Sequence, residues 1–245
     1  LTEHLRGMLL GGVIIVILGI FDDIYALPAK PKFLVQIAAA LVAVWAGNKI
    51  EFLSNPNIFS SEPYWELGWL SIPISVLWIV GITNAVNLID GLDGLACGVS
   101  TISSMTLLVI ALTVSEPDVA LLMAALAGAC IGFLPYNLNP AKIFMGDTGS
   151  LFLGGMVCGL AFALDVPLVL ILVGFVYIVE TLSDIIQVAY FKLTHGKRVF
   201  KMAPIHHHFE MCGWKEKKIC VVFSLVNAAG CILALVLLIK GTFGK

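Results

Sequence analysis

Two acidic residues and two glycines share a short stretch between long apolar runs, and they are the first candidates for chemistry. In NAVNLIDGLDG (residues 84–94), Asp90 and Asp93 lie three residues apart, so they share one face if the segment is helical. Gly91 and Gly94 let a ligand approach the backbone closely. Oxygen-rich clusters of this kind suit Mg²⁺ or hydrogen-bond donors on a base or a sugar. The plain alternative is a capped, glycine-rich turn between two helices.

A pair of adjacent carboxylates, Asp22 and Asp23, ends the first apolar run of the chain. Two such groups repel each other unless a cation or a basic group lies between them. At the C-terminus of a helix they would also oppose the helix dipole. This mismatch favours a functional role over a merely solvated helix end.

The segment GDTGS (residues 146–150) places a carboxylate and two hydroxyls at a predicted helix N-terminus. Free backbone N–H groups at such a terminus can hold phosphate, and Asp147 is placed to bind a metal ion. The alternative is a plain N-cap made by Asp147 or Ser150.

Three adjacent histidines, His206, His207 and His208, form the last polar motif. Their side chains diverge, so they cannot all bind one metal ion, and we expect them to contact phosphate or substrate rather than zinc.

Glu180 and Asp184 lie one helical turn apart inside an apolar run. Ionisable groups at that depth should face protein or a wet groove, and the sequence leaves their role open.

The composition excludes an ordinary soluble domain, since 60% of the residues are hydrophobic, 12% are charged and the mean hydropathy is +1.01. The net charge of −2, with no dense basic tract, gives no indication of a nucleic-acid partner. The six cysteines form no CxxC pair and are interpreted as small packing residues. We predict an all-α polytopic membrane protein forming a single domain over residues 1–245.

Eight apolar runs are candidates for crossing about 30 Å of hydrocarbon. They cover residues 8–21, 33–47, 69–86, 97–114, 119–134, 151–164, 166–190 and 219–239. The runs 33–47 and 151–164 are short for a full crossing, so each needs support from its neighbours or is partly re-entrant.

If the runs alternate in direction, the loops fall into two sets. One set holds residues 22–32, 87–96, 135–150 and 191–218; the other holds the N-terminus, 48–68, 115–118, Asp165 and the C-terminus. Ten of the 14 lysines and arginines fall in the first set and four in the second. The positive-inside bias therefore predicts that the first set, with every polar motif above, faces the cytoplasm. The reaction suggested is phosphoryl transfer between a water-soluble nucleotide and a lipid.

Four motifs in this order resemble the polyprenyl-phosphate N-acetylhexosamine-1-phosphate transferases. The resemblance covers nearly the whole chain through Asp22-Asp23, NAVNLIDGLDGLA (84–96), NPAKIFMGDTGS (139–150) and APIHHHFE (203–210). It implies a multi-pass enzyme of the bacterial plasma membrane whose active site faces the cytoplasm, with Mg²⁺ as cofactor. It implies undecaprenyl phosphate and a UDP-sugar as substrates, and a homodimer is a possible assembly.

The resemblance also implies roles for particular residues. Asp147 would bind Mg²⁺, with Asp22 and Asp23 beside it, Asp22 being a candidate base, and His207 would complete the catalytic group. Substrate-binding positions would be Asn84, Asn87, Asp90, Gly91, Leu92, Asp93, Asn137, Phe144, His206, His207 and His208, with Asp90, Gly91, Leu92 and Asp93 lining the uridine pocket and Phe144 stacking on uracil.

Two branches of the family compete for the sugar. ETLSDIIQV (180–188) and KRVFKMAPIHHHFEMCGW (197–214) resemble the branch that uses UDP-MurNAc-pentapeptide and makes lipid I and UMP. DDIYALPAKPKFLVQ (22–36) and NLIDGLDGLACGVS (87–100) look more like the branch that transfers N-acetylglucosamine-1-phosphate from UDP-GlcNAc. That branch typically has an arginine soon after the paired histidines, where His208-Phe209-Glu210 stands here. We therefore favour the muramoyl-pentapeptide substrate.

The chain departs from the family at its front. Family members usually have ten spans, and we expect the sequence, which starts at Leu1, to lack two spans and a cytoplasmic loop before Asp22.

An ion-coupled transporter that uses Glu180 and Asp184 is the alternative of another class. No convincing internal repeat supports it, and most polar groups cluster at one predicted surface rather than at mid-membrane depth.

Overall fold

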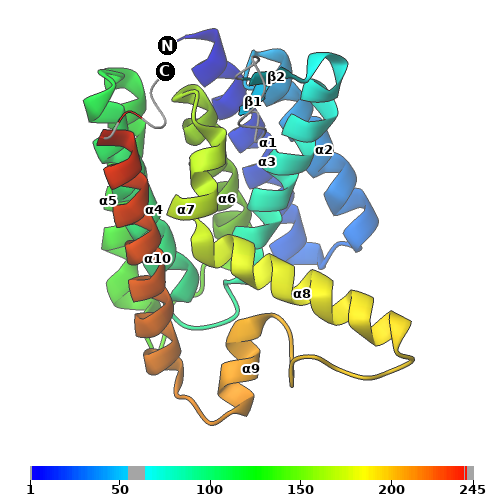
Figure 1. The fold of residues 1–245 in the computed structure, drawn as a ribbon. Helices are drawn as coiled ribbons and strands as arrows, with labels where there is room; N and C mark the ends of the chain where they lie inside the picture. Colours follow the sequence, from blue (N-terminus) through cyan, green and yellow to red (C-terminus); the bar gives the residue numbers. More distant parts are fainter. Residues whose placement is uncertain (1, 55–63, 240, 242–245) are drawn as a thin grey trace.

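The computed structural model describes residues 2–54, 64–239 and 241, and it consists almost entirely of helices (Figure 1). The long helices are α1 (Glu3–Tyr25), α2 (Ala29–Trp45), α3 (Ser71–Leu88), α4 (Leu95–Thr113), α5 (Pro117–Asn137), α6 (Gly146–Ala163), α8 (Phe175–Leu193) and α10 (Glu216–Ile239). The short elements are β1 (Phe52–Ser54), β2 (Tyr64–Glu66), η1 (Gly68–Leu70), η2 (Pro167–Val169), α7 (Leu170–Val173) and α9 (Ile205–Met211). The prediction of an all-α polytopic membrane protein is confirmed.

The eight predicted apolar runs all fall on helices, but not all of them form simple spans. Six described helices, one of them joined to η1, are long and apolar enough to cross a membrane, and a bent pair raises this to seven. The bent pair is η2 and α7 joined to α8 at an angle of 85°, so the predicted run 166–190 is broken rather than straight. The predicted run 33–47 lies on α2, one unbroken helix of 17 residues.

The broken helix is stabilised by a side chain from α10. The Asn227 amide nitrogen donates to the Val173 carbonyl at 3.0 Å, and the Asn227 amide oxygen accepts from the Val176 backbone N–H at 3.4 Å. Backbone groups released at a break in an apolar helix need such partners, because hydrocarbon offers none. Figure 1 shows the result: α8 turns away from the bundle and runs out to one side.

The two predicted loop sets lie at opposite ends of the bundle. At one end, Figure 1 places the start of α1, the end of α10 and the antiparallel pair β1–β2, in which Leu53 faces Trp65. Residues 55–63 of the predicted loop 48–68 lie outside the described residues. The other end carries the α1–α2, α3–α4 and α5–α6 connections together with α9. The four polar motifs therefore occur at one end of the molecule.

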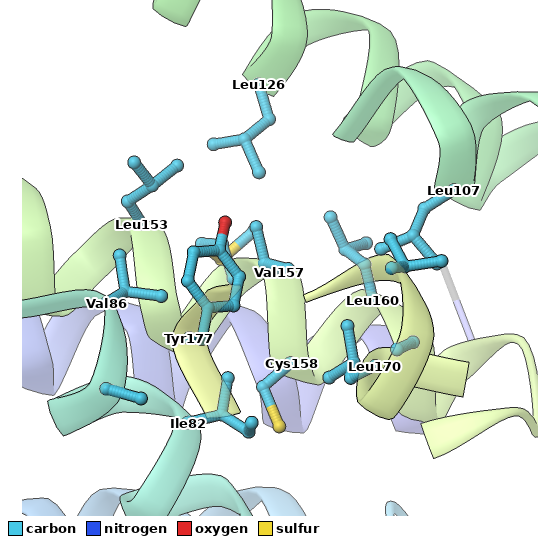
Figure 2. Close-up of a cluster of buried hydrophobic side chains, with 14 of the residues drawn as sticks. Ile82, Val86, Leu107, Leu126, Leu153, Val157, Cys158, Leu160, Leu170 and Tyr177 are labelled. Carbon is cyan, nitrogen blue, oxygen red and sulfur yellow. The ribbon is translucent and has the colours of Figure 1, made fainter. Parts of the chain in front are cut away.

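The core fills the space between α3, α4, α6 and the broken helix. Figure 2 shows Tyr177 among Val86, Leu153 and Val157, with its hydroxyl pointing toward Leu126. That hydroxyl donates to Ser100 Oγ at 2.8 Å, which satisfies the polar end of a fully buried side chain. The part of α1 that precedes the aspartate pair packs in a second, smaller cluster, in which Ile15 and Leu18 meet Ala39 and Leu151.

Helix α6 packs closely on α3 because glycine stands at their contact. A Cβ atom built on Gly154 would lie 2.9 Å from both the Cα and the carbonyl oxygen of Thr83, whereas one built on Gly155 would lie 3.7 Å from Thr83 Oγ1. A methyl group at position 154 would therefore clash with the Thr83 backbone, which would have to move. A methyl group at position 155 would make ordinary van der Waals contact with the Thr83 hydroxyl.

The two adjacent glycines give a matched test of this packing. We expect Gly154→Ala to lower the thermal unfolding midpoint in detergent by roughly 4–8 °C, since overpacking at a rigid contact costs about 1–3 kcal/mol. Gly155→Ala should leave the midpoint unchanged or raise it, because alanine is the better helix former. Equal effects of the two substitutions would contradict the packing shown here.

Candidate active site

The N-terminus of α6 is capped by a side chain from another helix. Asp23, near the end of α1, accepts the backbone N–H of Asp147 at 2.8 Å, the backbone N–H of Thr148 at 3.1 Å and the Thr148 hydroxyl. A carboxylate at this position satisfies free N–H groups and is stabilised by the positive end of the helix dipole. Both oxygens of Asp23 are therefore occupied in fixing the backbone of Asp147.

A lysine lies between the two remaining carboxylates of the site. Lys32 Nζ, in the first turn of α2, is 2.6 Å from Asp22 Oδ2 and 3.2 Å from Asp147 Oδ2. The other oxygen of Asp22 accepts the backbone N–H of Leu27 at 2.8 Å. This ammonium relieves the repulsion that two neighbouring carboxylates would otherwise suffer.

Asn87 fixes the second oxygen of Asp147. Its amide nitrogen donates to Asp147 Oδ1 at 2.9 Å and to Ser150 Oγ at 2.8 Å, which ties α3 to the first turn of α6. Asn84, one turn earlier on α3, instead donates to Gln36 Oε1 on α2 at 2.6 Å. We call Asp22, Asp23 and Asp147, together with Lys32, the carboxylate centre. Asn87 thus belongs to this centre, whereas Asn84 lines the cavity beside it.

The turn after α3 carries a carboxyl group with an unusual proton affinity. Burial, followed by the negative charges of Asp147 and Asp23, raises the pKa of Asp90 from its ordinary value of 3.8 to about 7. These charges act on Asp90 because the turn lies next to the carboxylate centre. A neutral Asp90 at moderate pH can donate a hydrogen bond, which an ionised carboxylate cannot do.

Asp93 and Asn137 hold the loop between α5 and α6 rather than the carboxylate centre. Asp93 Oδ2 accepts the backbone N–H of Ala141 at 2.9 Å, and Asn137 bonds to the Gly94 N–H and the Ile143 carbonyl. The loop presents Phe144, whose side chain is 75% exposed. The ring is free to stack on a flat ligand, and Asp93 and Asn137 fix the backbone that carries it.

The three histidines occupy different environments. His206 is fully buried, His207 is partly exposed and pairs through Nδ1 with Glu210, and His208 Nδ1 accepts the Lys201 backbone N–H at 3.1 Å. The side chain of Leu92, in the predicted uridine pocket, is also buried, with 7% exposed. His206 therefore has no exposed surface to offer a ligand, whereas His207 and His208 are both partly exposed, and the ligand contacts predicted for the three histidines and Leu92 stay predictions.

An open, mainly apolar cavity of about 560 Å³ leads to the carboxylate centre. Its walls come from the start of α2, from α3 and from the start of α6. It is lined by Ala29, Lys30, Lys32, Phe33, Leu34, Gln36, Asn84, Asn87, Asp147 and Leu151. An apolar surface that ends at an ammonium and a carboxylate suits an amphiphile whose head group is anionic.

The residues present fit a magnesium ion better than a metal held by protein alone. Among the described residues, no group of three or more histidine, cysteine, aspartate or glutamate side chains is arranged to hold a metal ion. Magnesium is commonly bound by one or two carboxylates together with water and substrate phosphates, so such a group is not required. Asp147 and Asp22 already share one cation, the Lys32 ammonium.

Several contacts of the site were not predicted from the sequence. Lys32, Thr148 and Ser150 take part in the carboxylate centre through contacts with residues more than 60 positions away or on another helix. Glu180, whose role was left open, bonds to His206. The only sequence signal for Lys32 is a cation at the start of an apolar run soon after two aspartates, which is too common to identify a site.

A family model described as glycosyl transferase family 4 matches residues 5–165, about two thirds of the chain. The chain belongs to glycosyl transferase family 4. The part matched to this family contains the aspartate pair, the turn after α3 and the first turn of α6, which the structure brings together. The resemblance to polyprenyl-phosphate transferases is thereby confirmed at the level of the family.

Three curated relatives of the chain share one name. A phospho-N-acetylmuramoyl-pentapeptide-transferase of Acetivibrio thermocellus is 54% identical over 169 residues, which cover 69% of this chain and 51% of that relative. The proteins of the same name from Clostridium acetobutylicum and Listeria welshimeri are 47% and 42% identical, and each match covers 87% of this chain. Those matches cover 67% and 66% of the two relatives. The chain thus spans between about half and two thirds of the length of these curated relatives.

The raised pKa of Asp90 predicts how stability depends on pH. Between pH 3.8 and about 7, the folded protein holds a proton on Asp90 that the unfolded chain has released, so unfolding becomes easier as pH rises through this window. Asp90→Asn lacks this proton. In a chelating buffer, the thermal midpoint of the parent relative to Asp90→Asn should therefore fall by roughly 5–10 °C from pH 5 to pH 8. A difference that does not change with pH would contradict the assignment.

Proposed function

We propose that this protein transfers phospho-N-acetylmuramoyl-pentapeptide from UDP-MurNAc-pentapeptide to undecaprenyl phosphate, giving lipid I and UMP, and that it requires Mg²⁺. The observation that carries the proposal is that two other motifs, the aspartate pair and residues 84–94, meet at the first turn of α6, which carries the third motif. Asp23, Lys32 and Asn87 all contact Asp147 or its backbone. The name shared by relatives that are 42–54% identical supports the choice of sugar.

The turn after α3 and the α5–α6 loop support binding of the nucleotide. Phe144 offers an exposed ring for stacking on uracil. Asp90, held largely protonated below its raised pKa of about 7, offers both a donor and an acceptor to the base or the ribose. His207, held by Glu210, is placed to approach a phosphate or the sugar.

The cavity at the start of α2 supports binding of the lipid acceptor. Phe33, Leu34 and Leu151 supply apolar walls for isoprenoid groups, while Lys32 provides a cation for the terminal phosphate. A phosphate monoester is largely ionised at pH 7, so its oxygen needs little help from a base. This reduces the demand on Asp22, which is already paired with Lys32.

The reaction exchanges one phosphoryl bond for another. An oxygen of the lipid phosphate attacks the β-phosphorus of the nucleotide, the P–O bond between β-phosphorus and the bridging oxygen breaks, and UMP leaves with that oxygen. Asp147 and Asp22 would hold the magnesium ion, which when bound neutralises charge on the phosphates. Asp23 and Asn87 keep Asp147 in place throughout.

The distribution of basic residues supports an orientation with this end of the bundle in the cytoplasm of a bacterial cell. Ten of the 14 lysines and arginines belong to the predicted loop set at this end, some of them in the first or last turns of helices. UDP-sugars are water-soluble, so a site that uses them must open to the aqueous phase that contains them.

The comparison of nucleotide sugars tests the proposal directly. Membranes bearing the full-length protein, given Mg²⁺ and undecaprenyl phosphate, should release UMP from UDP-MurNAc-pentapeptide and form a lipid-linked product. The resemblance of residues 22–36 to the other branch makes UDP-GlcNAc the informative second substrate. Product from UDP-GlcNAc but not from the muramoyl nucleotide would replace our choice of sugar, and turnover of neither would reject the proposed function.

Asp147→Asn tests the metal role at the carboxylate centre. The amide removes the charge that attracts the cation but keeps the side-chain size, so we expect kcat to fall roughly 100-fold or more, with folded protein retained. Asp165→Asn is a matched control, because Asp165 is exposed in a tight turn between α6 and η2. Near-normal turnover of Asp147→Asn, measured over a range of Mg²⁺ concentrations, would reject its assignment.

A further inference from the structure

A glutamate and a histidine form a fully buried pair outside the carboxylate centre. Glu180 on α8 and His206 on α9 are both 0% exposed, and His206 Nδ1 lies 3.1 Å from Glu180 Oε2. The backbone N–H of His206 donates to the same oxygen at 3.4 Å. Neither the mechanism above nor the sequence motifs assign a role to Glu180.

The pair fixes which edge of the His206 imidazole faces the turn after α3, residues 89–94, to which we assign the nucleotide and which we call the nucleotide-binding turn. A carboxylate only accepts hydrogen bonds, so Nδ1 carries the hydrogen and Nε2 points away from Glu180. A Cβ atom built on Gly91 would lie 2.9 Å from His206 Nε2, so this ring edge touches the backbone of the turn. Glycine at position 91 is what permits so close an approach.

The His206 imidazole also contacts His207, which is partly exposed. The rings of His206 and His207 lie with their centroids 4.1 Å apart and are tilted by 54°. His206 therefore contacts the nucleotide-binding turn and His207 together, although it has no exposed surface of its own. A residue placed in this way can act on a substrate only through its neighbours.

Docking of α9 does not depend on the imidazole. Ser183 Oγ accepts the backbone N–H of Ile205 at 2.9 Å, and the Gln187 amide oxygen accepts the N–H groups of Val199 and Phe200 at 3.0 Å each. These bonds already attach the segment before α9 to α8. In contrast, Glu180 Oε1 and His206 Nε2 are buried without a hydrogen-bond partner, which is a poor arrangement if the pair served stability alone.

We infer that Glu180 is a positioning residue, which acts through His206 to hold the backbone at Gly91 and the ring of His207 for the UDP-sugar. The inference rests on the proposed function, because it assigns the nucleotide to the turn that His206 supports. The inference gives the three histidines different roles. His206 supports the backbone at Gly91, His207 contacts the ligand, and His208 holds the loop before α9 through Lys201. Loss of the pair should weaken binding of the nucleotide but not of the lipid phosphate, whose cavity shares no lining residue with it.

The experiment is a double-mutant cycle on the KM for each substrate in the full-length protein. Glu180→Leu removes the acceptor, and His206→Asn keeps a donor near Glu180 but withdraws the ring edge from Gly91. We expect each to raise the KM for the UDP-sugar about tenfold with the KM for undecaprenyl phosphate within about twofold, and the double variant to be no worse than the poorer single one. Glu180→Gln, which retains an acceptor oxygen, should restore the KM for the UDP-sugar to within about threefold of the parent.

Ser183→Ala is the matched control on the same face of α8. It removes a bond to the α9 backbone without touching the imidazole, so we expect a lower thermal midpoint with both KM values within about twofold. KM does not depend on the fraction of active enzyme, so instability alone does not mimic the expected result. Should Glu180→Leu not fold, His206→Asn still decides, because it keeps a donor for Glu180.

Three results would overturn the inference. They are additive effects in the cycle, an equal rise in both KM values, or an unchanged KM for the UDP-sugar in His206→Asn. If the parent enzyme turns over the UDP-sugar and the effects of the two substitutions on KM are additive, the inference about Glu180 fails but the proposed function stands. A parent that turns over neither nucleotide sugar overturns both.

Discussion

The structure depends on keeping several carboxylates together at the end of an apolar bundle. Asp22, Asp23 and Asp147 come from two helices, and the repulsion between them is relieved in two ways. Asp23 is stabilised by the free N–H groups at the start of α6, and Asp22 and Asp147 share the Lys32 ammonium. Burial, followed by the negative charges of Asp147 and Asp23, still raises the pKa of Asp90. This excess of negative charge would attract the magnesium ion that we propose.

This arrangement requires close approach between helices far apart in sequence. Asp23 reaches the α6 N-terminus across 124 positions, and Asn87 reaches Ser150 across 63. The contact between α3 and α6 is close because Gly154 lies against the backbone of Thr83. Small residues at helix contacts are a general means of tight association in membranes, where the hydrophobic effect does not drive helices together.

The bend between α7 and α8 explains how the histidines reach the site. A straight helix would carry Glu180, Ser183 and Gln187 along the bundle, whereas the 85° bend carries them beneath its end. From there their side chains bond to the segment that includes α9. Asn227 satisfies the backbone groups that the bend releases, so this departure from helical regularity is stabilised within the core.

The sequence by itself determined the fold class and the grouping of polar motifs at one end, because hydrophobic run lengths and alternating loops follow from the thickness of a bilayer. It also identified Asp22, Asp23 and Asp147 as neighbours, through the resemblance of ordered motifs. Tertiary structure alone decided that Asp23 caps α6, that Lys32 bridges Asp22 and Asp147, and that His206 is buried against Glu180. Contacts between residues 10 to 124 positions apart leave no periodic signal in a single sequence, since they depend on how the helices pack rather than on local spacing.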